Sequence, residues 1–128
     1  MAMTAQPASA ASAPYACPWD GSGLGSYGFC LFYNSGGNGA KYAMWDPDPD
    51  LAGSTFNLTG TTSAGYGKPV KNNAASAYNG TRNCKIVVYY NSNYDTRNGY
   101  DIIYPGEAKN LQKTYNENAS VGFHCVPK

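Results

Sequence analysis

The sequence is poor in charge. Lysine and arginine together number nine, aspartate and glutamate number eight, and the formal net charge is +1. The basic residues are scattered, whereas a nucleic-acid-binding protein usually carries a clustered basic excess. No apolar run approaches the roughly 18 residues that a membrane-spanning helix needs. We therefore expect neither a nucleic-acid partner nor a membrane.

Residues that could support catalysis are also scarce. His124 is the only histidine, so a Ser-His-Asp site would have to use it. It stands beside Cys125 in an expected strand, and no Gly-x-Ser-x-Gly sequence supplies a nucleophile. Carboxylates are present, but the sequence singles out no pair for acid and base roles. We expect a protein that is not an enzyme.

Tyrosine and glycine are abundant, with 12 and 15 residues. Tyrosine favours strands and half-exposed surfaces, and glycine supplies the positive φ angles of turns. Long helical periods of leucine, alanine, glutamate and lysine are missing. The composition predicts an all-β domain with many turns.

Four cysteines occur in the chain, at Cys17, Cys30, Cys84 and Cys125. An even number of cysteines in a small, loop-rich chain favours two disulfides and an oxidising, extracellular compartment. A zinc site is the alternative, although the spacings are wide and no Cys-x-x-Cys pair is present. Four cysteines allow three pairings, which the sequence does not decide; we favour the local pairs Cys17–Cys30 and Cys84–Cys125.

Residues 1–16 are small and rich in alanine and serine, which predicts a flexible N-terminal arm before a single domain at 17–128. Two Ala-Ser-Ala sequences, at 8–10 and 11–13, look like signal-peptidase sites. No apolar segment precedes them. We interpret the arm as a signal-peptide remnant or linker of a secreted protein.

A weak internal repeat runs through the chain. The strand-like sequences at 30–35 and 87–92 are each followed by an Asn- or Gly-rich turn and a second strand, which is typical of a hairpin. Each hairpin precedes an Asn-rich segment ending in Ala-Ser, at 72–76 and 116–120. The hairpins are 57 positions apart and the Ala-Ser segments 44. Two such units predict a Greek-key sandwich with extra loop in the first unit, at 46–50 and 59–67.

These motifs together resemble a known family. The Cys-Pro at 17–18, Gly-Phe-Cys-Leu-Phe-Tyr at 28–33, Tyr-Tyr-Asn-Ser-Asn-Tyr at 89–94 and the two Ala-Ser segments are similar to the secreted actinobacterial proteins of peptidase inhibitor family I36. That family includes a Streptomyces metalloproteinase inhibitor. The resemblance implies a βγ-crystallin-like fold and a protein partner.

The resemblance also implies a calcium motif, because βγ-crystallin-like domains bind calcium through an Asn/Asp-Asn/Asp-x-x-Ser/Thr-Ser segment. Asn72, Asn73 and Ser76 match it, but Ala77 replaces the final serine. The second segment departs at Glu117 and at Val121. Neutral amide and hydroxyl oxygens are weak calcium ligands, so any such site would be weak. The alternative is that the segments are structural turns.

Two further features have open interpretations. Asp46 to Asp50 alternates aspartate with proline, which keeps the stretch extended and its carboxylates apart. A solvated acidic loop or a docking loop would both fit. Trp19, Trp45 and the tyrosines could stack on sugars, or they could fill the core.

Two functions follow as expectations. The first is an inhibitor that presents a rigid, disulfide-held loop to a secreted protease. The second is an adaptor or structural subunit of a secreted assembly, such as a toxin complex, that docks through its arm. In that case Pro14, Tyr15 and Trp19 would be the anchors, since aromatic residues are favoured at interfaces.

Overall fold

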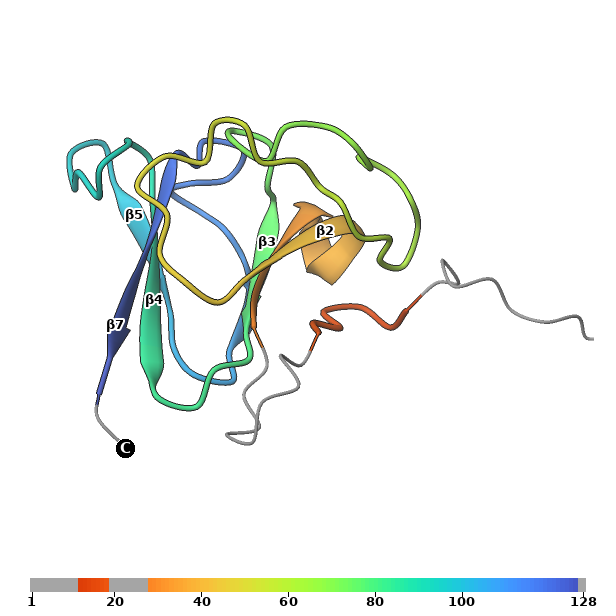
Figure 1. Ribbon diagram of the computed structural model, residues 1–128, viewed down its shortest axis with the longest axis horizontal. Coiled ribbons are helices and arrows are strands. Elements are labelled where there is room, and N and C mark those ends of the chain that lie inside the picture. The colour runs from red at the N-terminus through yellow and green to blue at the C-terminus, as the bar shows by residue number, and fades with distance from the viewer. Residues whose placement is uncertain (1–11, 19–27, 127–128) are drawn as a thin grey trace, which may run out of the picture.

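A computed structural model describes residues 12–18 and 28–126 of the chain (Figure 1). The elements are β1 Phe29–Asn34, the single 3-10 turn η1 Ser35–Gly37, β2 Asn38–Met44, β3 Ser76–Asn79, β4 Cys84–Tyr89, β5 Tyr100–Ile103, β6 Ala108–Asn110 and β7 Ser120–Cys125. They form a four-stranded sheet in the order β2-β1-β3-β6 and a three-stranded sheet in the order β5-β4-β7. All strand pairs are antiparallel. The expected all-β sandwich with two disulfides is confirmed.

The two sheets do not coincide with the two sequence repeats. The first unit supplies β1, β2 and β3, and the second supplies β4, β5 and β7. However, β6 of the second unit pairs with β3 in the sheet of the first. In return, Asp48 of the first unit pairs with Val121 at the edge of β7. Each unit thus lends a segment to the other's sheet, which is a Greek-key arrangement.

Two serines hold the hairpins in the same way. The Ser76 hydroxyl donates to the Asn34 carbonyl at 2.6 Å and accepts from the Gly37 amide at 2.9 Å. The Ser120 hydroxyl donates to the Asn91 carbonyl at 2.7 Å and accepts from the Tyr94 amide at 3.1 Å. These serines are the last residues of the two Ala-Ser segments. The contacts confirm that the two units are structural repeats.

The core lies between the sheets and is built from alternate residues of the strands other than β6 and from residues 51–74 between β2 and β3. Its largest fully buried apolar side chains are Phe29, Phe56, Leu31, Leu51, Ile86, Ile103, Val70, Val88 and Val121. Phe29 of the first sheet meets Phe123 of the second edge to face, with ring centroids 6.4 Å apart. Such contacts fix the sheets against each other.

The connection between β2 and β3, residues 45–75, carries the extra loop that the repeat offset predicts. Single bridges join Lys41 to Leu58 and Thr55 to Pro69, and Phe56 and Leu51 of this connection enter the core. The connection is therefore a packed part of the domain. Figure 1 shows it arching across one end of the sandwich.

No helix among the described residues is long and apolar enough to cross a membrane.

Candidate functional site

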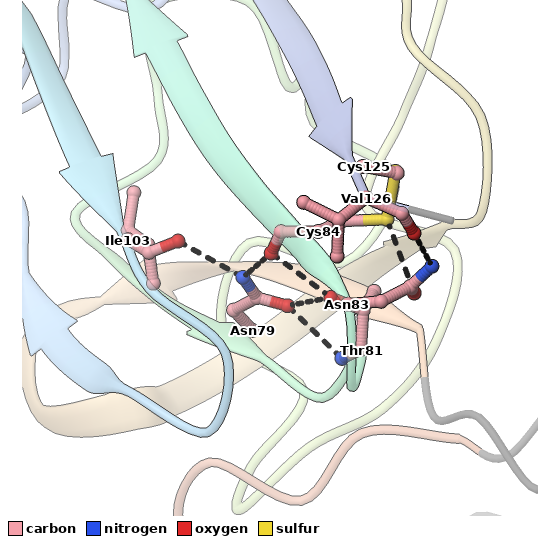
Figure 2. The surroundings of a disulfide bond; sticks show 7 residues. All are labelled: Asn79, Thr81, Asn83, Cys84, Ile103, Cys125 and Val126. Carbon is pink, nitrogen blue, oxygen red and sulfur yellow. Dashed lines mark hydrogen bonds between the residues drawn. A yellow bond between two sulfur atoms is a disulfide. The ribbon is translucent and has the colours of Figure 1, made fainter. Parts of the chain in front are cut away.

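The cysteines pair as expected. Cys17 joins Cys30, and Cys84 joins Cys125. The second bond links directly opposite residues of β4 and β7. Figure 2 shows it where β7 ends, beside Asn83, whose amide donates to the Val126 carbonyl at 2.8 Å. The end of β7 is thus held to β4 covalently and by hydrogen bonds.

Asn79 anchors the same end of the sandwich. Its side chain is fully buried and donates to the carbonyls of Cys84 and Ile103 at 2.7 and 2.9 Å (Figure 2). Its amide oxygen accepts from both the backbone amide and the hydroxyl of Thr81. One side chain from the first sheet therefore satisfies polar backbone groups of the second.

The N-terminal arm was predicted to span residues 1–16, and the structure describes residues 12–16 of it, which contact the domain. The Tyr15 amide donates to the Gly37 carbonyl at 3.0 Å, and the Tyr15 ring packs edge-on against Phe32. Lys41 donates to the carbonyl of Ala16 at 2.7 Å. A Cβ on Gly37 would lie 2.4 Å from the Tyr15 ring, so only glycine permits this contact. The segment lies across β1 and β2 because glycine leaves room for the ring.

The structure describes two of the three residues predicted to anchor a partner. Pro14 is exposed, and Tyr15 is half-buried against its own domain. Tyr15 and Cys17 line a hollow of about 270 Å³ with Tyr78. Trp19 lies outside the described residues. Partner binding through the arm stays a prediction.

Of the three candidate calcium residues, Asn73 lines a polar hollow of about 270 Å³ together with Asn34 and Asn116. Asn72 is exposed with φ at 65°, and Asn73 donates to the carbonyls of Pro69 and Lys71. The Ser76 hydroxyl is committed to the hairpin bonds described above. The hollow offers neutral oxygens without a carboxylate, a poor set of ligands for Ca²⁺. Calcium binding stays a prediction and carries no further argument.

An apolar hollow of about 200 Å³ opens on the outer side of β7. It is lined by Pro47, Tyr89, Tyr94, Gly122, Phe123 and His124. The Tyr89 ring stands 5.9 Å from that of Tyr94 between centroids, and its hydroxyl lies 3.5 Å from His124 Nε2. Burial raises the pKa of the Tyr89 phenol, so this hydroxyl stays uncharged.

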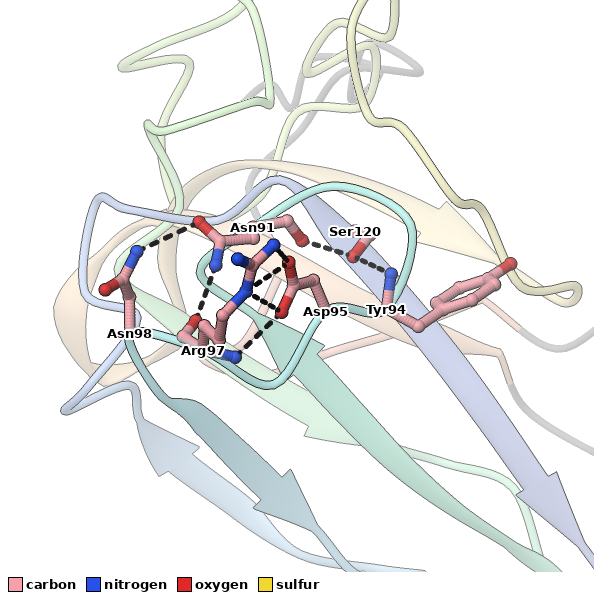
Figure 3. Close-up of polar contacts among 6 residues, drawn as sticks. All are labelled: Asn91, Tyr94, Asp95, Arg97, Asn98 and Ser120. Carbon is pink, nitrogen blue, oxygen red and sulfur yellow. Dashed lines mark hydrogen bonds and ion pairs between the residues drawn. The ribbon is translucent and has the colours of Figure 1, made fainter.

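The loop that presents Tyr94 is held by a polar network, which Figure 3 shows. Asp95 forms an ion pair with Arg97 and also accepts from the Arg97 backbone amide. Hydrogen bonding by Arg97 lowers the pKa of Asp95 to about 2. Asn91 donates to the Arg97 carbonyl at 2.6 Å and closes the loop from the other side. The Tyr94 ring points away from this network (Figure 3) and is 38% exposed.

Sequence reasoning did not find this hollow, because its lining comes from three distant segments. Pro47 belongs to the acidic loop, Tyr89 and Tyr94 to the second hairpin, and residues 122–124 to the last strand. The pairing of Asp48 with Val121 brings them together. Interface surfaces are enriched in aromatic residues and depleted in charge at their centre, as this hollow is.

Comparison with known proteins identifies the family. The model of peptidase inhibitor family I36 matches residues 4–100, which is most of the chain. The chain belongs to peptidase inhibitor family I36. No curated protein sequence matches it significantly. Membership of family I36 and the two disulfides are consistent with an extracellular protein.

Two solved structures show the fold that this I36 chain shares. The first was solved in work titled "Evolution of the eye lens beta-gamma-crystallin domain fold"; its TM-score is 0.59 and its identity 10%, with 78% of this chain and 87% of that chain covered. The second is the N-terminal domain of Protein S, with a TM-score of 0.53, 19% identity, and coverage of 79% and 99%. The expected βγ-crystallin-like fold is confirmed.

Proposed function

We propose that this protein is secreted and inhibits a peptidase by binding it through a rigid surface. The observation that carries the proposal is the match to peptidase inhibitor family I36 over residues 4–100. An inhibitor of this kind loses little conformational entropy on binding if its surface is already ordered. The two disulfides and the serine-held hairpins provide that order.

The apolar hollow beside β7 is the surface best suited to the peptidase. Its aromatic lining and its lack of charged carboxylates are typical of the centre of a protein interface. Trp45, 39% exposed, lies in a second hollow that shares Pro47 with the first. The two hollows meet at Pro47, and Asp46 and Asp48 make the second one partly polar.

The test is an inhibition assay against a panel of secreted serine, metallo- and cysteine peptidases from actinobacterial culture supernatants. We expect the disulfide-intact protein to inhibit at least one peptidase, and Tyr94→Ser to weaken this inhibition about tenfold or more. Tyr66→Ser is the matched control, because Tyr66 is 57% exposed and lies outside both hollows. Complete inactivity against the panel would refute the inhibitor proposal.

The second candidate is an adaptor that docks a subunit of a secreted assembly through its N-terminal segment. Pro14 is exposed, and the hollow beside Tyr15 would receive a partner's side chain. Removal of residues 1–11 leaves the contacts of Tyr15 intact, whereas Pro14→Ser changes the exposed surface alone. For an adaptor, we expect capture of a partner without peptidase activity, and loss of that capture in one of these two variants. Capture that is unchanged in both would refute docking through the arm.

A further inference from the structure

The two repeats differ in the backbone hydrogen bonding at one pair of equivalent positions, Asn79 in β3 and Phe123 in β7. They lie 44 positions apart, the same offset as that between Ser76 and Ser120. The Asn79 amide donates to the Glu107 carbonyl at 2.9 Å, and the Asn79 carbonyl accepts from the Gly106 amide at 2.7 Å. The segment that leads into β6 therefore satisfies the edge of the first sheet at this point.

The equivalent ladder on β7 stops after a single bridge. Asp48 and Val121 exchange two backbone hydrogen bonds, each 2.9 Å long. If the antiparallel ladder continued, Asp46 would face Phe123, but Asp46 lies in a bend between β2 and the bridge. Proline on both sides of Asp48 also hinders a longer strand. Within residues 12–18 and 28–126, no backbone group bonds to the amide or carbonyl of Phe123 on this side.

The direction of the Phe123 backbone follows from its neighbours. Val121 bonds to Asp48, which lies on the side of β7 away from β4. Backbone N–H and C=O groups alternate between the two sides of a strand, so those of Phe123 point to the same side of β7 as those of Val121. Val126 is an odd number of residues from Phe123, and its backbone amide accordingly donates to the opposite side, to the Asn83 carbonyl beside β4. The edge of β7 thus presents one donor and one acceptor at Phe123.

The surroundings of this edge suit an extended chain. The hollow of about 200 Å³ lies beside it, and Gly122 contributes no side chain to fill the space. The Cys84–Cys125 bond holds the strand in its paired conformation. Open strand edges bind extended peptides through backbone bonds, and adjacent hollows select their side chains.

We propose that the edge of β7 at Phe123 binds an extended segment of a protein partner as an added strand. The segment takes the place that residues 106–108 occupy on β3, and one apolar side chain of it enters the hollow beside Tyr94. This proposal rests on the proposed protein-binding function, but it does not require the partner to be a peptidase.

The first test is selection from a phage library of random linear dodecapeptides against the disulfide-intact protein. We expect enrichment of peptides with apolar residues at alternate positions, as an added strand requires. Synthetic versions should lose at least tenfold in affinity when the amides that face β7 are N-methylated, since this removes the donors. N-methylation of the alternate amides is the matched control.

Two variants locate the binding surface. Gly122→Val should weaken peptide binding at least tenfold, because a Cβ there lies 3.2 Å from the Tyr89 ring and the added methyl groups fill the hollow. Tyr94→Ser should weaken it as well, whereas Tyr66→Ser should not. A library that yields no binder, or binders that tolerate all these changes, would overturn the proposal. If the protein binds peptides at this edge but inhibits no peptidase, the edge-binding proposal stands and only the inhibitor function is refuted.

Amide hydrogen exchange examines the edge without a ligand. In the free monomer we expect the Phe123 amide to exchange at least tenfold faster than its repeat equivalent, the Asn79 amide. The selected peptide should slow exchange of the Phe123 amide and leave exchange of the Asn79 amide unchanged. Protection of Phe123 in the free monomer would show that the chain covers its own edge and would overturn the proposal. The protein could instead associate with itself through this edge. Self-association that Gly122→Val abolishes, and that N-methylated peptides do not change, would identify a second copy as the occupant and would also overturn the proposal.

Discussion

Ser76 and Ser120 each bind the hairpin of their own unit with one donated and one accepted hydrogen bond. Both are fully buried, so removal of either hydroxyl leaves a backbone carbonyl and amide without their partner. We expect Ser76→Ala and Ser120→Ala each to lower the free energy of unfolding by about 1–3 kcal/mol. Denaturant unfolding measures this. Ser63→Ala, at an exposed site, is the control and should stay within about 0.5 kcal/mol of the parent. Equal stability of all three variants would contradict a stabilising role for the Ser76 and Ser120 hydroxyls.

Asn79→Asp tests the buried amide. The substitution keeps the shape but replaces the donor to the Cys84 and Ile103 carbonyls with an oxygen. We expect a loss of about 3 kcal/mol near neutral pH. The loss should be smaller in acid, because a protonated carboxyl regains one donor. Thermal unfolding at pH 7 and pH 4 provides the comparison, and a loss independent of pH would contradict a cost set by the protonation state of the carboxyl.

The two disulfides should differ in their contributions. They close loops with sequence separations of 13 and 41 residues. Chain-entropy arguments give about 3 kcal/mol for the shorter loop and about 4 kcal/mol for the longer one. We expect the double alanine variant of Cys84 and Cys125 to unfold at lower denaturant concentration than that of Cys17 and Cys30. Equal midpoints would mean that strain or residual structure outweighs the loop term.

The Asp95–Arg97 pair gives one exposed loop a small contribution to stability that depends on acid pH. The folded pKa of Asp95 is about 2, below the ordinary value of 3.8. The stabilising contribution of Asp95 is therefore fully present above pH 4 and is lost as the pH falls through about 2. Arg97→Gln removes the main cause of the shift, so the pKa of Asp95 should rise toward 3.8. NMR titration of the carboxyl carbon measures it, and an unchanged pKa would assign the shift to the backbone amide.

The sequence predicted the fold because its signals are local or repeated. The hairpin turns are marked by Asn and Gly, and the Ala-Ser segments precede the strands that begin at Ser76 and Ser120. The sequence left three cysteine pairings open, and the favoured local pairing agrees with the disulfides and with the register of β4 and β7.

The hollow beside β7 could not be predicted in the same way. It depends on the bridge from Asp48 to Val121, which joins residues 73 positions apart, and no local pattern marks such a contact. The contact of Tyr15 with its own domain was missed for a related reason. The Tyr15 ring packs over Gly37, where any side chain would collide with it. In the sequence, Gly37 cannot be told from an ordinary glycine of a turn.

The exchange of segments between the sheets also concerns how the chain can come apart. β6 belongs to the second half of the chain yet completes the first sheet, and Ala74 and Asn118 bind each other across the halves through two hydrogen bonds. Neither half keeps its edges covered when the other leaves. We therefore expect that neither half folds without the other and that the domain melts in one cooperative step. A chain cut between Thr81 and Cys84 would recover this structure only when both fragments are present together.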